Sequence, residues 1–382
     1  MIVGLDAKRI VRNATGLGSY GRTLVNDLAR LSTPDAPLQL RLYAPDAGRD
    51  ELRRQVQAST ATCFCYPRPG SLLPAALRKA LWRSRGIVAD LQRDSVQLYH
   101  GLSGELPVGI SRSGIRSVVT IHDLIFMRHP EYYNPIDRWV YTWKFRQAIS
   151  QADHIIAISE CTKRDIIELG QVDERRITVV YQSYSPRFSA QGAGQHASQV
   201  SQHYGLPRRF VLTVGTIEAR KNVLLAVKAL PLLPADVSLV AVGRRTDYAD
   251  RVLRYAREHG LADRVRFLHG VTDEELPALY ALAEAFVYLS RYEGFGIPII
   301  EAIGMGLPVV ACTGSCLEEA GGPDSLYVDP DDEQALARAL TSVLCNAGER
   351  QRRVELSQQY ITRFGNTSAA QQVLAVYERL RE

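Results

Sequence analysis

The sequence predicts an α/β protein with two domains, each built around a parallel β-sheet. A chain of 382 residues is longer than one hydrophobic core usually serves, so two domains are expected. Short β-rich runs alternate with helical stretches in both halves of the chain, which is the pattern of βαβ units. Small and polar residues without apolar periodicity occupy positions 189–202, as expected of a linker or an exposed loop between domains.

The expected strands and helices fall into two sets. In the first half, β-rich runs predict strands at residues 2–5, 38–43, 96–100, 117–121, 154–158 and 177–181. Amphipathic segments between them, such as 21–31 and 136–151, predict helices. In the second half, the expected strands are 210–214, 238–242, 265–268, 285–288 and 309–311, and the last helices are 334–344 and 368–380.

These elements set the expected domain boundaries. We expect a first domain over residues 1–188, a linker over 189–205, a second domain over 206–360, and a C-terminal helix within 361–382 that packs back on the first domain. Ligands of open parallel sheets bind beyond the carboxyl ends of the strands. Two such sheets that face each other would form a central cleft, so functional residues are expected just after strands in both halves.

The composition is that of an ordinary globular protein. Hydrophobic residues make up 46% and charged residues 23% of the chain, and no apolar run approaches the ~18 residues that a membrane-spanning helix needs. The N-terminal residues lack the basic-then-apolar layout of a signal peptide. Six cysteines without zinc-like spacing fit a reducing compartment, so a cytoplasmic protein is expected.

The net charge of +5 is unevenly distributed. Residues 1–190 hold 26 Lys and Arg against 18 Asp and Glu, a charge of +8, whereas residues 191–382 hold 20 against 23, a charge of −3. The basic first half predicts an anionic partner such as a phosphate group or a membrane surface, although a solvated Arg-rich face would look the same. Nucleic acid is not expected as a partner, because no binding module or aromatic-basic pattern accompanies the charge.

A glycine motif near the N-terminus resembles a dinucleotide-binding fingerprint, but its position in the sequence does not favour dinucleotide binding. Gly16, Gly18 and Gly21 match the fingerprint GxGxxG, which in a dehydrogenase follows the first strand directly. Here about ten residues separate the strand end near Asp6 from the motif. We instead expect a flexible glycine loop that opens a helix near Ser19 and favours an anion at the helix N-terminus. Glycines that serve only a tight turn are the alternative.

A second motif suggests a metal. Asp329-Pro330-Asp331 resembles a DxD metal-binding motif, but it stands between a strand end and an amphipathic helix. Asp331 as the N-cap of that helix, with acidic residues in its first turn, explains the segment without a metal. We therefore expect no bound metal ion.

His122 stands just after the expected strand 117–121, at the carboxyl end of the first domain's sheet. Its neighbour Asp123 is unlikely to orient it as a catalytic dyad, since adjacent residues at a strand end point in different directions. A lone histidine is often only a hydrogen-bonded loop residue. Its position at a strand end that faces the expected cleft makes His122 a candidate site residue.

The most informative stretch runs from Glu293 to Glu301. It follows the expected strand 285–288 and leads into a helix with Pro298 near its first turn. The backbone amides of residues 294–297, at the helix N-terminus, suit a negative group. Glu301, about a turn further in, can accept hydrogen bonds from vicinal hydroxyls, and Glu293 would reach another part of the same ligand. Two carboxylates around a nest of amides match the sugar, diphosphate and ribose of a nucleotide-sugar.

Arg220 and Lys221 follow the expected strand 210–214 directly. Positive charge at the start of the next helix opposes the helix dipole, so this placement makes sense if an anion shares the site. A diphosphate leaving group would be that anion, and preorganised cations would offset its growing charge. Two ordinary surface cations are the alternative.

Together these motifs resemble the family 4 glycosyltransferases of the GT-B fold, in particular bacterial O-antigen and exopolysaccharide mannosyltransferases. In the second half the likeness rests on the E-x7-E motif from Glu293 to Glu301 and on GTIEARKN, FLHGVTDEELPALYALAEAFVYLS and GLPVVAC. In the first half it rests on HDLIFMRHPEYYNP and IIAISECTKRDI. The resemblance implies two Rossmann-like domains with parallel sheets facing a central cleft, the first binding the acceptor and the second the nucleotide-sugar.

The resemblance also implies roles for single residues. His122 would touch the donor sugar near the reacting carbon, Glu293 would hold that sugar, and Arg220 and Lys221 would grip the diphosphate. Many relatives carry an arginine where this chain has Thr216, so Arg220 would have to compensate for it. The residues implied to bind the nucleotide-sugar are Gly16, Gly18, Thr272 (in the loop that would meet the base), Gly294, Phe295, Gly296, Ile297 and Glu301 (on the ribose hydroxyls).

The implied reaction is the retaining transfer of a hexose from a nucleotide-sugar to a growing cell-surface glycan, with GDP-mannose or a related GDP-deoxyhexose favoured as the donor. In front-face attack the leaving phosphate can take the acceptor's proton, and no metal or other cofactor is implied. The alternatives are a nucleotide-sugar epimerase of the same fold, a dinucleotide-dependent oxidoreductase built on the Gly16 motif, and a glycan-binding protein.

Residues 71–86 predict contact with a membrane surface. The apolar residues near one face of the expected helix are Leu73, Leu77, Leu81 and Trp82, and the basic residues beside them are Arg78, Lys79, Arg83 and Arg85. An acceptor carried on a polyprenyl diphosphate would place the protein peripherally on the inner face of the cell membrane. The same apolar stripe could instead pack on the first domain's core, and its exposure to solvent decides between the two.

Overall fold

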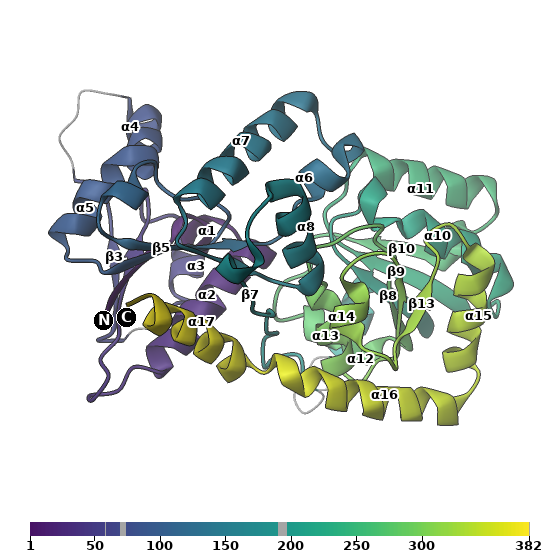
Figure 1. Cartoon of the computed structure of the whole chain (residues 1–382). Coiled ribbons are helices and arrows are strands. Elements are labelled where there is room, and N and C mark those ends of the chain that lie inside the picture. Colours follow the sequence, from purple (N-terminus) through teal and green to yellow (C-terminus); the bar gives the residue numbers. More distant parts are fainter. Residues whose placement is uncertain (58, 69–73, 190–196, 382) are drawn as a thin grey trace. The chain divides into compact units, whose positions relative to one another are not determined.

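The protein is described as a computed structural model that covers residues 1–57, 59–68, 74–189 and 197–381. The chain forms two compact units (Figure 1). Unit 1 holds Met1–Ser183 and the C-terminal residues from Phe364 onward, and unit 2 holds Tyr184–Arg363. The sequence places the end of the first domain a few residues later, at 188, and the return to it a few residues earlier, at 361.

Unit 1 is built on a seven-stranded sheet with the order β3-β2-β1-β4-β5-β6-β7. All neighbouring strands are parallel. The order reverses between β1 and β4, and open parallel sheets bind their ligands beside such a switch point. The strands are β1 (Ile2–Asp6), β2 (Gln39–Tyr43), β3 (Thr62–Cys65), β4 (Leu98–Gly101), β5 (Arg116–Ile121), β6 (His154–Ala157) and β7 (Ile177–Val179).

Alternate residues of these strands face two hydrophobic cores, because side chains of a strand point to opposite faces of the sheet. Val118 and Ile156 belong to one core, and Val119 and Ile155 belong to the other. The C-terminal helix α17 lies beside α2 (Figure 1) and adds Tyr377 to the first core. The α-helices of unit 1 are α1 (Lys8–Arg12), α2 (Gly16–Arg30), α3 (Asp50–Arg53), α4 (Ala75–Leu81), α5 (Ile87–Arg93), α6 (Ile125–Arg128), α7 (Pro135–Gln151), α8 (Glu160–Gly170) and α17 (Asn366–Arg381).

Unit 2 is built on a six-stranded parallel sheet with the order β10-β9-β8-β11-β12-β13. Every residue of β9 and β11 is buried, as expected of parallel strands covered on both faces. The strands are β8 (Arg209–Val214), β9 (Val237–Val242), β10 (Val265–Leu268), β11 (Ala285–Tyr288), β12 (Val309–Cys312) and β13 (Leu326–Val328). The α-helices are α9 (Ala197–Tyr204), α10 (Val223–Ala229), α11 (Asp247–Glu258), α12 (Leu276–Leu282), α13 (Ile297–Gly304), α14 (Leu317–Gly321), α15 (Glu333–Leu344) and α16 (Ala347–Ile361).

The segment predicted as a linker, 189–205, contains a helix. Residues 197–204 form α9, which packs against α12, while residues 190–196 lie outside the described part of the chain. Val200 is buried, and the Tyr204 hydroxyl donates a hydrogen bond to Glu275 at 2.9 Å. The prediction was wrong for this helix because its small, polar composition conceals one buried apolar contact.

The predicted membrane-facing segment 71–86 is divided between solvent and core. Leu77 and Leu81 on α4 are 48% and 46% exposed. Trp82 instead packs beside the second core of unit 1, where its Nε1 donates to Asp90 at 2.7 Å. Successive helix residues differ by about 100° in direction, which separates Trp82 from Leu81. Leu73 lies outside the described residues. Within the described ranges, no helix has the length and apolarity needed to cross a bilayer.

Candidate active site

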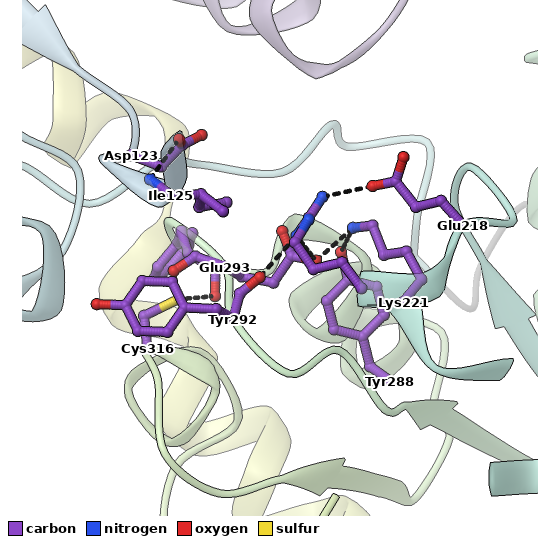
Figure 2. A network of polar contacts seen from close by, with 10 residues as sticks. Asp123, Ile125, Glu218, Lys221, Tyr288, Tyr292, Glu293 and Cys316 are labelled. Carbon is purple, nitrogen blue, oxygen red and sulfur yellow. Dashed lines mark hydrogen bonds and ion pairs between the residues drawn. The ribbon is translucent and has the colours of Figure 1, made fainter. Parts of the chain in front are cut away.

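Three charged side chains meet beyond the carboxyl ends of two strands of unit 2. The Glu293 carboxylate forms ion pairs with Arg220, at 2.8 Å from Nη1 to Oε1, and with the Nζ atom of Lys221. Lys221 also donates a hydrogen bond to the Tyr288 hydroxyl at 2.7 Å. Figure 2 shows the Lys221 side chain directed at both Glu293 and Tyr288. The three charged side chains are only 11–15% exposed, so water is largely excluded from the cluster.

Backbone contacts hold the cluster together. Because β8 and β11 pair in the sheet, the loops that follow them are neighbours. The Arg220 carbonyl accepts a hydrogen bond from the Arg291 amide at 2.9 Å, and Arg220 Nη1 donates to the Tyr292 carbonyl at 2.6 Å. Asn222, with a left-handed φ of 54°, separates the 3-10 turn Ala219–Lys221 from α10. The two cations therefore precede α10, and the sequence interpretation that they open this helix against its dipole was wrong.

The ion pairs fix the charges of the cluster. Burial raises the pKa of Glu293, but Lys221 and Arg220 outweigh burial and bring this pKa down to about 2. Burial lowers the pKa of both cations, and the attraction of Glu293 overcomes it, so both pKa values lie above their usual range. Arg220 also pairs with Glu218 at 2.8 Å. The sequence predicts a ligand diphosphate as the anion for these cations, whereas in the structure Glu293 and Glu218 neutralise them.

The loop from Glu293 leads directly into the N-terminus of α13. Gly296 has a φ of +122°, which only glycine adopts easily, and an added Cβ would lie 3.2 Å from the Leu317 side chain. The Cys316 thiol donates to the carbonyls of Glu293 and Phe295, at 3.1 and 2.9 Å, and Figure 2 shows this thiol beside the loop. Gly294, Phe295, Gly296 and Ile297 thus lie together where the positive end of the α13 dipole begins.

Glu301 lies in the second turn of α13 in a very different environment from Glu293. The Tyr280 hydroxyl donates a hydrogen bond to its Oε2 at 3.2 Å. Burial raises the pKa of Glu301 to about 7, although Arg187 and Tyr280 oppose this rise. One carboxylate of unit 2 is therefore held ionised and the other titrates near neutrality, a contrast that often separates the roles of two acids in one site.

The Gly270–Thr272 loop follows β10. Gly270 adopts a φ of +72°, and the Thr272 amide donates to Glu275 Oε2 at 2.9 Å. The Thr272 hydroxyl in turn accepts from the Glu275 amide at 3.3 Å, so the two residues form the reciprocal bonds of a capping box in the turn that precedes α12. Thr272 therefore has a structural function in the protein, and its contact with a base stays a prediction.

His122 lies at the carboxyl end of β5 in unit 1. Its Nε2 donates to the Leu102 carbonyl at 2.8 Å, and its Nδ1 accepts from Gln182 Nε2 at 3.1 Å. Burial lowers the pKa of His122 to about 4, so the ring is neutral at physiological pH. The ring edge contacts Tyr20 at a centroid distance of 4.9 Å. Both ring nitrogens are engaged within unit 1, which suits a positioning group better than a general base.

A cavity of about 310 Å³ in unit 1 adjoins His122. Arg9 and Asp123 supply polar groups to its wall. Three aromatic side chains that contact one another form another part of the wall: Phe126, Tyr133 and Tyr141. Aromatic faces beside hydrogen-bonding groups suit the apolar faces and hydroxyls of a sugar. Phe126 and Tyr133 lie in the segment HDLIFMRHPEYYNP and Tyr141 follows it, but no spacing in the sequence marked them as a site.

Gly16 and Gly18 lie within the first turn of α2, and the prediction of a flexible loop with a helix near Ser19 was wrong. A Cβ at Gly18 would lie 1.8 Å from the Asn13 carbonyl oxygen, so this glycine allows close packing, whereas nothing lies within 4 Å of a Cβ at Gly16. Helix α1 stands between β1 and α2. The motif therefore does not form the strand-turn-helix of a dinucleotide site, and the structure does not favour the oxidoreductase alternative.

The Asp329–Asp331 segment is explained by local pairing. Asp331 forms an ion pair with Arg291, and its amide donates to Asp329 Oδ1 at 2.8 Å. Asp332 is the N-cap of α15, accepting from the Ala335 amide at 2.7 Å, so the prediction that Asp331 caps this helix was wrong by one residue. In the part of the chain that the structure describes, no three His, Cys, Asp or Glu side chains are grouped as metal ligands.

Two parallel α/β units, with polar residues beyond the carboxyl ends of their strands, define a GT-B architecture. Residues 199–360 match the model of glycosyl transferases group 1, and residues 15–186 match that of glycosyltransferase family 4. O-antigen chain mannosyltransferase B of Escherichia coli is 32% identical over 340 residues, which cover 85% of each chain. The chain therefore belongs to the family described by these two models, the group 1 and family 4 glycosyltransferases, and it is a glycosyltransferase.

Solved structures agree on the fold. A glycosyltransferase from Rickettsia africae superposes with a TM-score of 0.75 at 18% identity, covering 99% of this chain and 98% of that one. Anabaena HepE, crystallised with UDP and glucose, superposes with a TM-score of 0.73 at 20% identity, covering 99% of both chains. At these identities the likeness shows the GT-B fold, which confirms the predicted fold class.

Proposed function

We propose that the protein is a retaining hexosyltransferase that moves mannose, or a related deoxyhexose, from a GDP-linked donor to a growing cell-surface glycan. The observation that carries the proposal is the shielded cluster of Arg220, Lys221 and Glu293 beside the start of α13. The similarity to the O-antigen chain mannosyltransferase of Escherichia coli supports a mannosyl donor and an O-antigen type of acceptor.

In the proposed donor complex, the diphosphate lies between the two cations and the N-terminus of α13. Glu293 holds Arg220 and Lys221 in place before the donor binds, so little reorganisation is needed when the phosphates arrive. The Gly294–Ile297 backbone lies alongside the phosphates and the sugar. Glu301 accepts hydrogen bonds from the ribose hydroxyls, and the loop at Thr272 meets the base.

In the proposed reaction, the acceptor oxygen attacks the anomeric carbon on the face from which the diphosphate departs. The carbon–oxygen bond to the phosphate breaks, the new glycosidic bond forms on the same face, and a phosphate oxygen takes the acceptor's proton. His122, with both ring nitrogens engaged, positions the sugar and does not serve as a base. Arg220 and Lys221 stabilise the charge that develops on the leaving group, so no metal ion is needed.

Unit 1 is proposed to bind the acceptor. The aromatic cavity beside His122 offers stacking faces and polar groups for an acceptor sugar. We propose that this glycan is carried on a polyprenyl diphosphate, so that the protein works at the inner face of the cell membrane as a peripheral protein.

A thermal-shift screen tests the donor. A ligand that binds only the folded state raises the melting temperature, by an amount set by its concentration relative to its Kd. GDP and GDP-mannose should raise it more than UDP, ADP, dTDP and their sugars do. An equal or larger response to UDP-sugars would overturn the GDP assignment. Product analysis with and without acceptor separates the transferase from an epimerase, which would convert the donor without acceptor.

A further inference from the structure

Unit 1 contains a second cavity that the proposed chemistry does not use. Its volume is about 450 Å³, and it lies at the carboxyl edge of the unit 1 sheet, beside Asp6 at the end of β1. Glu105 and Lys144 line both this cavity and the aromatic cavity beside His122, so the two are neighbours. The ion pair between Lys144 and Glu105, at 3.1 Å, forms the wall that they share.

The wall of this second cavity carries more positive than negative charge. Its five cationic side chains are Lys8, Arg12, Lys79, Arg83 and Lys144. They face three carboxylates, Asp6, Glu105 and the adjoining Asp46, which leaves an excess of two positive charges. A dianionic group would balance that excess.

The ion pairs show which cation is available. Arg83 pairs with Asp6 at 2.8 Å and with Glu105, and Lys144 pairs with Glu105 at 3.1 Å. Arg12 and Lys79 both pair with Asp46, Lys79 at 2.6 Å. Among the described residues, Lys8 forms no ion pair, and its ammonium group is half-buried. Burial and the nearby charges of Arg83 and Arg9 lower the pKa of Lys8, although Glu105 and Asp6 oppose this. An anion bound here would relieve that repulsion.

Exposed apolar side chains stand at the mouth of the same cavity. Leu81 of α4 and Trp143 of α7 line it and are 46% and 54% exposed. Leu77, one turn from Leu81, is 48% exposed, and Ile136 and Trp139 of α7 are 75% and 70% exposed. Positions 136, 139 and 143 follow helical spacing and share one face of α7. Tryptophan on a surface helix beside basic residues is typical of a membrane interface.

We propose, resting on the lipid-linked acceptor of the proposed function, that this cavity binds the phosphate head of a membrane lipid while the α4 and α7 apolar residues lie in the bilayer interface. The occupant is the lipid diphosphate that carries the acceptor. Lys8 contacts the phosphate oxygens, and Lys79 and Arg12 reach them from their shared ion pair with Asp46. Leu77, Leu81, Ile136, Trp139 and Trp143 contact the acyl or prenyl chain, and the sugar end extends toward the aromatic cavity.

Vesicle co-sedimentation of the full chain tests this site. Binding to phosphatidylglycerol-containing vesicles at low salt should exceed binding to pure phosphatidylcholine vesicles, and inorganic pyrophosphate should compete. The double variant Trp139→Ala/Trp143→Ala should weaken vesicle binding about tenfold or more. Lys8→Gln should weaken it about fivefold, the loss of one basic contact near an anionic surface. Leu232→Ala and Lys228→Gln, exposed residues of unit 2, are the matched controls and should bind as the parent protein does.

Three results would overturn the proposal. No preference for phosphatidylglycerol, or equal binding by the parent and the tryptophan double variant, would overturn the proposal. Sensitivity to Lys8→Gln without sensitivity to the tryptophans would show a site for free anions and would also overturn it. GDP binding, measured by thermal shift on the parent protein, tests the proposed function separately, because the proposed GDP contacts at Arg220, Lys221 and Glu301 include no residue of this cavity.

Discussion

The polar centres of the two units contrast in charge. In unit 2, Glu293, Arg220 and Lys221 are all ionised, and each is held by an oppositely charged neighbour. In unit 1, His122 is buried and neutral, and aromatic side chains line the cavity beside it. A shielded set of charges is suited to a diphosphate, whereas a neutral aromatic cavity is suited to a sugar. The contrast supports the proposal that unit 2 binds the charged diphosphate of the donor and unit 1 binds the acceptor sugar.

The largest expected effect comes from removing one cation of unit 2. Lys221→Met should lower kcat about 10²–10³-fold, the usual loss when one preorganised group facing developing charge is removed. Lys228→Met, an exposed lysine on α10, is the matched control and should leave kcat close to that of the parent. Steady-state kinetics and melting temperatures of both variants make the test. A kcat near that of the parent in a folded Lys221→Met protein would contradict the proposal that unit 2 stabilises the charge of the donor.

The second expected effect separates Glu301 from Glu293 within unit 2. Glu301→Ala should weaken GDP binding about 10- to 100-fold, because hydrogen bonds to a charged acceptor contribute about 1.5–3 kcal/mol. Calorimetric titration of GDP into the parent and the variant measures this difference. Unchanged affinity would show that the ribose does not lie at Glu301.

A smaller effect is expected in the pH dependence. The pKa of Glu301 is raised to about 7, so GDP affinity should fall as pH decreases from about 8 to 6 and the carboxylate is protonated. The apo protein should show the opposite trend: the contribution of Glu301 to folding stability is full below pH 4.5 and is lost as pH rises through 7. Glu301→Gln should abolish both trends.

His122 supplies the control for this pH dependence. Its pKa is lowered to about 4, so His122→Gln should keep the change in GDP affinity near pH 7. Disappearance of that change in the His122 variant would assign it to unit 1 and contradict the proposed division of labour.

The smallest expected effect is that of a chelator. Transfer activity should survive EDTA, because Arg220 and Lys221 supply the positive charge that a metal would otherwise bring. Activity assays with EDTA, and with added Mg²⁺ or Mn²⁺ after its removal, measure this. Strict metal dependence would point to Asp329 and Asp331 and would oppose the account of unit 2.

Strands and helices were predictable from the sequence where their residues are continuously buried. β11 has the expected bounds, because a parallel strand covered on both faces carries an uninterrupted apolar run. Helix α9 was missed because it buries only Val200 among its residues. The first turn of α2 was taken for a loop because glycine disfavours helix interiors, although packing against Asn13 requires Gly18.

The residues of the candidate site were predictable from the sequence, but the ion pairs between them were not. Glu293, Arg220 and Lys221 were found from their positions after strands. Their ion pairs depend on β8 and β11 being neighbours in the sheet, which the order of strands along the chain does not reveal. The exposure of Trp139 and Trp143 was not predictable either, because the periodicity within 136–151 does not distinguish a buried helix face from an exposed one.

The anomeric configuration of the product tests the central claim most directly. Purified protein would be incubated with GDP-α-mannose and a water-soluble oligomannoside acceptor, and the new linkage assigned by NMR from the one-bond carbon–proton coupling at its anomeric carbon. The proposed front-face reaction at the Arg220–Lys221–Glu293 cluster predicts an α-linked mannose, with configuration retained. A β-linked product, or release of free mannose without transfer, would contradict the account.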